Sequence, residues 1–194
     1  MHLKDILSLF AGVLHVAGFV PYVRAIVRKV TEPAKASWLI WATLDSITCA
    51  GMYAKHTLNG QIIGAGLGAW MVFVLVTKYG KPGWTRLDKF CLGGAVLGIA
   101  LWKISGNPTF GIMTSLSVMF LGSFPTFASA WHDPSKEDRT AWTIFWISCV
   151  FAVIAIPAWT LADAAQPVIF SLIDSIVMFI LYMRPRLLAS TARL

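Results

Sequence analysis

The amino-acid sequence predicts an all-α integral membrane protein of seven transmembrane helices, built as two parallel three-helix repeats joined by a linker helix. Of its 194 residues, 57% are hydrophobic and only 13% are charged, and the mean hydropathy is +0.71. Soluble domains carry about a quarter charged residues. A soluble core could not hide this much apolar surface, so we expect lipid to cover much of it.

Seven apolar runs are long enough to cross a bilayer, for which a helix needs about 20 residues. Backbone polar groups must be satisfied within the bilayer, and these runs are too long and continuous for the strands of a barrel. Turn-forming residues separate the runs. The expected spans are 5–28, 37–56, 60–78, 87–103, 108–131, 140–158 and 165–183.

Lysine and arginine residues divide unevenly between the two sides of the expected membrane. Of the 16, only Lys4, Lys55 and Lys103 fall on one side, which leaves 13 on the other. Positive charge marks the cytoplasmic side. We therefore expect the N-terminus outside and the C-terminus inside, in a bacterial inner (plasma) membrane. The basic residues sit at helix ends and not on one solvated face, so no nucleic-acid partner is expected.

An internal repeat emerges when the sequence is shifted by 104 residues, which superimposes the first two spans on the fifth and sixth. The matched pairs are Gly18 with Gly122, Pro21 with Pro125, Trp38 with Trp142 and Ile40 with Ile144. Because four spans separate the copies, both run in the same direction, related by an axis along the membrane normal. We expect a first repeat at 1–80, a linker helix at 81–106, and a second repeat with a short cytoplasmic tail at 107–194.

Proline motifs in the two repeats carry a family resemblance. Pro21-Tyr22 and Pro125-Thr126-Phe127 stand in the first and fifth spans, where one group of transporters places a Pro-Gln or Pro-Thr-Phe signature. Together with the 3+1+3 arrangement, they make the chain resemble the SWEET/PQ-loop superfamily of small-molecule transporters. The resemblance implies transport by alternating access. Val168 stands where sugar-transporting members carry asparagine, so the resemblance implies a fold and a mode of action and not a particular substrate.

Three ionisable side chains are expected near the middle of the bilayer: His15 in the first span, Asp45 in the second and Asp174 in the last. A charge at that depth is costly and usually faces the bundle interior. A low dielectric favours the neutral carboxyl group, and such an acid can take up and release a proton as access alternates. These residues are therefore candidates for proton coupling. The structural alternatives are acids hydrogen-bonded to Ser46 or Ser175, and a histidine satisfied within the core.

Aromatic and hydroxyl side chains accompany these acids. Trp41 precedes Asp45 by one helical turn, so the two share a face of the second span. Aromatic walls with a few polar groups are typical of small-molecule sites. The candidate substrate-binding residues are Trp41, Asp45, Trp70, Trp146, Ser171 and Asp174. Core packing is the alternative for the three tryptophans.

Glycine and proline stand close together in the first and fifth spans. Proline removes a backbone hydrogen bond from a helix, and a nearby glycine adds conformational freedom. We expect hinges at Gly18, Pro21, Gly122 and Pro125. Static kinks are the alternative.

These features predict a secondary transporter or facilitator of a small polar metabolite, whether sugar-like, amino-acid-like or cationic, with proton coupling as a hypothesis. No basic residue is expected inside the bilayer, so the site should favour neutral or cationic solutes over anions. The alternative is a seven-helix receptor or binding scaffold that does not transport.

The expected partners are a small-molecule substrate and the lipid bilayer. No catalytic motif is present, and the three cysteines show no metal-binding spacing. We therefore expect neither an enzyme nor a metal or other cofactor. The sequence leaves a homo-oligomer open, because one complete set of helices can enclose a pathway by itself.

Overall fold

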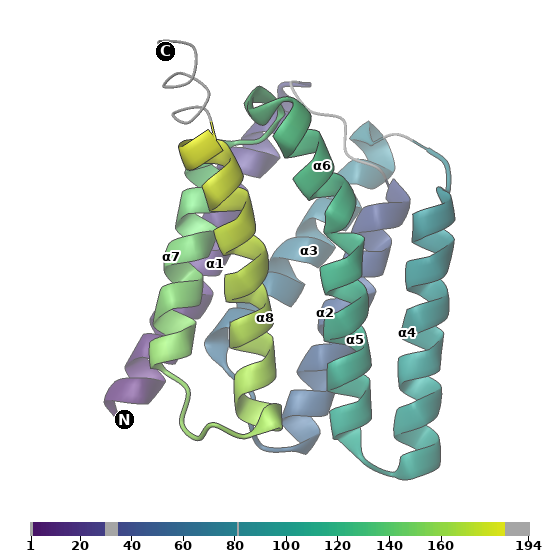
Figure 1. Cartoon of the computed structure of the whole chain (residues 1–194), viewed down its shortest axis with the longest axis vertical. Helices are drawn as coiled ribbons and strands as arrows, with labels where there is room; N and C mark the ends of the chain where they lie inside the picture. The colour runs from purple at the N-terminus through teal and green to yellow at the C-terminus, as the bar shows by residue number, and fades with distance from the viewer. Residues whose placement is uncertain (1, 30–34, 81, 185–194) are drawn as a thin grey trace.

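The computed structural model describes residues 2–29, 35–80 and 82–184, and nearly all of them are helical (Figure 1). The first four helices are α1 (Leu3–Val27), α2 (Lys35–Ala54), α3 (Gly60–Tyr79) and α4 (Arg86–Ser105). They are followed by α5 (Pro108–Gly122), α6 (Phe124–His132), the short 3-10 helix η1 (Pro134–Lys136), α7 (Arg139–Ile154), α8 (Leu161–Met178) and the π-helical turn η2 (Phe179–Met183). No strand occurs in this part of the chain, so the prediction of an all-helical protein is confirmed there.

Two of the expected spans differ from the helices that the structure has at the same positions. The span expected at 108–131 is divided at Ser123, because Pro125 has no backbone N–H with which to continue the hydrogen-bond ladder of α5. The span expected at 140–158 ends at Ile154, shortly before Pro157. A residue that precedes proline is biased away from helical geometry, which explains the early end.

The last helix begins earlier than the expected start at 165. Thr160 caps it, since the Thr160 hydroxyl accepts a hydrogen bond from the Asp163 backbone N–H at 3.2 Å and donates one to the Asp163 carboxylate. Pro167 consequently lies inside α8 rather than at its start. The expected span therefore missed the first turn of the helix.

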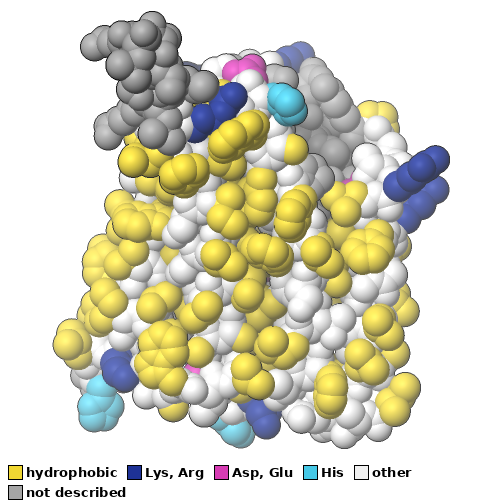
Figure 2. All heavy atoms as spheres, in the orientation of Figure 1, with side chains coloured by type: hydrophobic (Ala, Val, Ile, Leu, Met, Phe, Trp, Pro, Cys, Tyr) yellow, Lys and Arg dark blue, Asp and Glu magenta, His cyan; other side chains and the backbone are white. Residues whose placement is uncertain are grey.

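Four helical segments in the described residues are long and apolar enough to cross a membrane. They are Leu3–Val27, Gly60–Tyr79, Pro108–His132 and Leu161–Met183, and α7 is a shorter apolar helix of 16 residues. Figure 2 shows hydrophobic side chains over the middle of one face of the molecule, with basic and histidine side chains towards its two ends. Such a surface is compatible with an all-helical protein inserted in a membrane.

Among the described helices, six form a ring in the order α1, α3, α2, α5, α8 and α7, and α7 contacts α1 to close it. α4 lies outside this ring against α2 and α5, at the edge of the molecule in Figure 1. The ring therefore contains two groups of three neighbouring helices, α1–α3–α2 and α5–α8–α7. The two groups meet where α1 contacts α7 and where α2 contacts α5.

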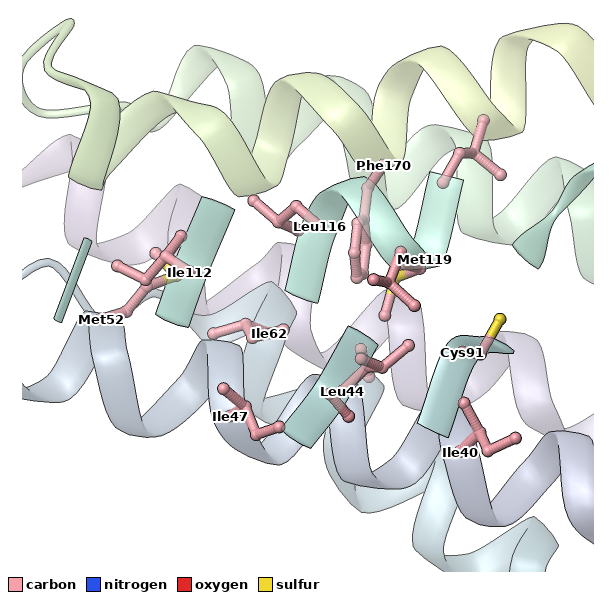
Figure 3. Packing of buried hydrophobic residues seen from close by; sticks show 14 of the residues in the cluster. Ile40, Leu44, Ile47, Met52, Ile62, Cys91, Ile112, Leu116, Met119 and Phe170 are labelled. Carbon is pink, nitrogen blue, oxygen red and sulfur yellow. The ribbon is translucent and has the colours of Figure 1, made fainter. Parts of the chain in front are cut away.

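The largest buried cluster joins the two groups (Figure 3). It includes Leu44 of α2, Ile62 of α3, Leu116 of α5 and Phe170 of α8, all of them buried. In a bilayer, lipid tails are as apolar as these side chains, so close packing and interhelical hydrogen bonds stabilise the bundle more than the hydrophobic effect does. The fit of the helices is therefore the main source of stability.

α1 and α3 approach most closely along three glycines, Gly12, Gly60 and Gly64. A Cβ atom added to Gly64 would lie 2.5 Å from the backbone oxygen of Gly12, a distance that only a shift of the backbone could relieve. The Gly60 N–H also donates a hydrogen bond to the Ser8 hydroxyl at 2.8 Å. Small residues at these positions let the two backbones come together, as in other membrane helix pairs.

We expect Gly64→Ala to destabilise the protein, because its new methyl group would meet the backbone of α1. Overpacking of this kind typically costs about 1–3 kcal/mol. The matched control is Gly66→Ala on the same helix, where the nearest atom to an added Cβ is the Cβ of Asp45 at an ordinary 3.8 Å. Thermal unfolding in detergent should show a lower Tm for Gly64→Ala only. Equal Tm values for the two variants would contradict the close approach of α1 and α3.

Candidate functional site: a central cavity that ends on buried acids

A cavity of about 280 Å³ lies inside the ring. Seven helices contribute to its wall: α1, α2, α3, α5, α6, α7 and α8. One end, here called the mouth, is lined by Ser37, Thr126, Glu137 and Asp138, close to where α2 and α7 begin. From the mouth the cavity reaches inward to His15, Asp45 and Asp174.

The two aspartates that the sequence predicts near the middle of the bilayer both line the cavity. Both are buried, with 5% of Asp45 and 7% of Asp174 exposed. The Cys149 thiol donates a hydrogen bond to the Asp174 carboxylate at 3.2 Å. Asp45 Oδ1, in contrast, has no hydrogen-bond partner among the described residues. The two carboxyl groups therefore occupy different environments: Asp174 receives a hydrogen bond from Cys149, and Asp45 receives none from the described residues.

Neither neighbouring serine pairs with these acids, so the hydrogen bonds of the structural alternative do not form. The Trp70 indole N–H donates to the Ser46 hydroxyl at 3.0 Å, and the Trp146 indole N–H donates to the Ser175 hydroxyl at 3.0 Å. Each tryptophan thus joins its helix to the helix that carries an acid. Neither acid forms a hydrogen bond with the serine that follows it in sequence.

A chain of buried amide and hydroxyl groups lies beyond the acids, at the end of the ring opposite the mouth. This polar seam consists of Asn59, Gln61, Ser148, Cys149 and Gln166. Asn59 Nδ2 donates to Gln166 Oε1 at 2.8 Å, and Gln166 Nε2 donates to Gln61 Oε1 at 3.0 Å. Gln61 Nε2 lies 3.2 Å from Ser148 Oγ and 3.1 Å from Cys149 Sγ, to which it donates.

The polar seam connects directly to two of the three candidate proton-coupling groups at the inner end of the cavity, His15 and Asp174. His15 Nδ1 lies 3.3 Å from Ser148 Oγ, whose hydroxyl also donates to the Ala11 carbonyl at 2.8 Å. Cys149 provides the link to Asp174. The seam joins α1, α3, α7 and α8 through satisfied hydrogen bonds, which is the state that buried polar groups require.

An aromatic wall covers one side of the cavity, and it consists of Trp41, Trp38, Phe19, Phe145 and Trp142. Successive ring centroids along this series lie 5.5, 6.1, 5.0 and 6.0 Å apart. These separations fall within the range of favourable aromatic contacts. The wall presents aromatic rings of α1, α2 and α7 to any solute in the cavity.

A carboxyl group at the mouth is partly buried against this wall. Glu137 Oε2 accepts a hydrogen bond from the Trp142 indole N–H at 2.9 Å. Burial raises the pKa of Glu137, and the hydrogen bond from Trp142 offsets part of that rise. Its neighbour Asp138 accepts a hydrogen bond from the Ala141 backbone N–H at 2.8 Å and so caps α7.

The structure brings some of the sequence-predicted site residues together and separates others. His15, Trp41, Asp45 and Asp174 line the cavity. Trp70 and Trp146 do not, since they are 41% and 36% exposed on the outside of the ring. Ser171 is half-buried on α8 and is also absent from the described cavity wall. Direct contact of these last three residues with a solute remains a prediction.

The two proline regions differ in structure. α1 continues through Pro21 without interruption, and Gly18 lies so close to α7 that an added Cβ would stand 2.5 Å from the Phe145 ring. In the other half, Gly122 is the last residue of α5 and Pro125 lies in the first turn of α6. A break in the helix thus exists at only one of the two expected hinges.

Cavity residues from the two halves of the chain correspond under the 104-residue shift. The pairs in the wall are His15 with Met119, Phe19 with Ser123, Tyr22 with Thr126, Ser37 with Ala141, Trp38 with Trp142, Trp41 with Phe145, and Ala69 with Ile173. The acids break this correspondence, because Asp45 is matched by Cys149, and Asp174 is matched by Trp70. The two halves therefore build a similar frame with different polar groups.

Sequence reasoning missed the polar seam. Asn59 belongs to the turn before the span expected at 60–78, and Gln61 and Gln166 lie near the starts of the spans expected at 60–78 and 165–183, where the sequence assigns them no role. The sequence signal that could have identified these residues is an amide side chain inside or beside an apolar run. Glu137 was also missed, because nothing local distinguishes it from an exposed loop carboxylate.

The wall of the cavity is acidic and contains no lysine or arginine among the described residues. Among the described residues, no group of three or more His, Cys, Asp or Glu side chains could hold a metal ion. Comparison of the chain with protein-family models, with curated proteins and with solved structures finds no match in any of the three. The function is therefore argued from this geometry.

We expect Glu137→Gln to flatten the pH dependence of thermal stability. Because burial raises the pKa of Glu137 in the folded protein, protonation of this carboxyl contributes stability that is present at acidic pH and lost as pH rises through the folded pKa. The amide cannot titrate, so the Tm of the variant relative to wild type should increase from about pH 4 to about pH 8, the range around a raised carboxyl pKa.

Scanning fluorimetry in detergent measures this difference, with Asp5→Asn as a control that removes an exposed carboxyl outside the cavity. A difference in Tm between Glu137→Gln and wild type that stays constant over the pH range would show that burial does not perturb this group.

Proposed function

We propose that this protein is a secondary transporter or facilitator that carries a small polar metabolite across a membrane by alternating access. The observation that carries this proposal is the central cavity, which enters the ring at the mouth and ends on the buried side chains of Asp45 and Asp174. Transporters place their substrate sites near the bilayer midplane, between repeats. The volume of about 280 Å³ is at the small end for ligand pockets and suits a small metabolite better than a peptide.

The proposed architecture has seven spans, with parallel repeats at 1–80 and 107–194 and a linker helix at 81–106. The correspondence of cavity residues under the 104-residue shift supports the repeats. The helix neighbours support them too, since α1–α3–α2 and α5–α8–α7 are equivalent sets and α4 lies outside the ring. On these grounds, together with the proline motifs, we propose kinship with the SWEET/PQ-loop superfamily.

In the proposed cycle, the structure corresponds to a state open at the mouth and closed at the polar seam. Opening the opposite end requires the amide chain of Asn59, Gln61 and Gln166 to separate, and the aromatic wall to close over the mouth. The two groups of helices would rock at the α1–α7 and α2–α5 contacts. The break between α5 and α6 gives one half a joint at which to bend.

The solute can be identified as a class by the thermal stability of the purified protein against sugars, amino acids, amines and vitamins at mildly acidic and neutral pH. A solute that binds the folded state raises Tm by mass action. The same panel is then tested for exchange in proteoliposomes.

We expect Asp45→Asn and Asp174→Asn each to lower solute exchange by about tenfold or more, the size of a lost hydrogen bond to a charged group. Because an amide cannot take up a proton, the remaining exchange should also depend less on pH. Asp5→Asn, outside the cavity, should leave exchange unchanged. If a panel solute raises Tm and none exchanges across the liposome membrane, the protein is a binding scaffold or receptor on the same fold.

We further propose that the mouth faces the cytoplasm of a bacterial cell and that the N-terminus lies outside. The excess of Lys and Arg at this end of the bundle supports that orientation.

Single cysteines test the orientation in a background without Cys49, Cys91 and Cys149. A membrane-impermeant thiol reagent applied to whole cells should label His56→Cys, in the loop between α2 and α3, and not Trp84→Cys, in the loop before α4. Both positions are exposed, so each should react in lysed cells. Labelling of Trp84→Cys alone in whole cells would reverse the orientation.

A further inference from the structure

We propose that the solute is a protonated amine that donates an N–H hydrogen bond to Asp45 and lies against the aromatic wall. This inference rests on the proposed function, because it assigns the substrate class of the transport cavity. It commits to one of the solute classes that the fold alone leaves open.

The charges at the cavity wall provide the first argument. Its ionisable carboxyl groups are Asp45, Asp174, Glu137 and Asp138, and no lysine or arginine faces them among the described lining residues. Field lines concentrate in a cleft with apolar walls, so a wall of one sign raises the local concentration of solutes of the opposite sign. A carboxylate-bearing solute would instead need a cationic partner that this wall does not provide.

The Asp45 carboxyl group, which lines the cavity and has no hydrogen-bond partner among the described residues, provides the second argument and identifies the kind of cation. Asp174 already accepts a hydrogen bond from Cys149, whereas Asp45 Oδ1 accepts none from the described residues. A buried acceptor without a donor is unfavourable. The N–H groups of a primary or secondary ammonium satisfy the hydrogen-bonding capacity and the charge of this carboxyl group together, and a quaternary ammonium supplies the charge alone.

The aromatic wall provides the third argument. Trp41 lies one turn before Asp45 on α2 and lines the same cavity, and Trp38 continues the wall with its ring centroid 5.5 Å from that of Trp41. The faces of tryptophan rings attract cations, most strongly where water is excluded. A carboxylate beside indole rings in a small cavity therefore suits an ammonium head group with a short carbon chain.

Four probes with one carbon skeleton test the proposal: 5-amino-1-pentanol, its N,N,N-trimethylammonium analogue, 1,5-pentanediol and 5-hydroxypentanoate. They differ in the group at one end, which is respectively an N–H cation, a quaternary cation, a neutral hydroxyl and an anion. Titration calorimetry and the Tm shift of the wild-type protein in detergent measure their binding. We expect the amine to bind most tightly, the quaternary analogue about tenfold more weakly, as for the loss of one charge-assisted hydrogen bond, and the diol and the anion without measurable effect.

Variants assign the binding to the predicted group. Asp45→Asn should weaken binding of the amine by about ten- to hundredfold and should affect the quaternary analogue less. Asp5→Asn should change neither affinity. The four-probe comparison uses the wild-type protein, so it stands even if Asp45→Asn does not fold.

Binding of the diol or the anion as tightly as the amine would overturn the assignment of an amine. Equal affinities for the amine and its quaternary analogue would overturn the hydrogen bond to Asp45. The exchange assay with the wider solute panel separates this inference from the proposed function. Exchange of a sugar or an anion, with no binding of the amine, would refute the amine and retain transport, whereas the absence of exchange for every solute would refute transport itself.

Discussion

Carboxyl groups inside a bundle with an apolar outer surface impose the constraint on which the rest of the structure depends. A charge without a partner at that depth is costly, so each acid needs a donor, a proton or a solute. The protein satisfies the two acids unequally: Cys149 donates to Asp174, and the Asp45 carboxyl group, which lines the cavity, receives no hydrogen bond from the described residues. The neighbouring serines do not fill this role: the Ser46 hydroxyl donates to the Ala42 carbonyl, and Ser175 accepts a hydrogen bond from Trp146.

The two ends of the ring are held by different forces, which gives the cavity its direction. At the closed end, the polar seam joins amides of α3 and α8 to hydroxyl and thiol groups of α7. Interhelical hydrogen bonds within membranes average about 0.6 kcal/mol each, so the seam stabilises the contact between these helices modestly. At the mouth, the wall consists mainly of aromatic rings and carboxyl groups. The aromatic rings at this end are held mainly by packing contacts rather than by hydrogen bonds.

Sequence periodicity and residue depth predicted part of the candidate site. His15, Asp45 and Asp174 could be chosen because an ionisable residue in the middle of an apolar run is unusual, and Trp41 because it shares a helix face with Asp45. The same reasoning could not separate Trp41 from Trp70 and Trp146. All three lie within apolar runs, and position in a run does not tell whether a side chain faces the ring interior or the surface. Gln61 and Gln166 were missed because their mutual hydrogen bond joins residues 105 positions apart.

The sequence by itself determined the helices, the apolar surface and the position of the acids in the middle of apolar runs, because these follow from composition and local periodicity. It also contained the 104-residue correspondence, since Gly18, Pro21, Trp38 and Ile40 recur in the same order and spacing in the second half of the chain. Only the tertiary structure decided which faces turn inward, that the cavity enters from one end, and that Asp45 is unpaired while Asp174 is not. Those properties depend on the rotation and separation of helices distant in sequence. Close contacts such as Gly12 with Gly64 and Gly18 with Phe145 set these positions.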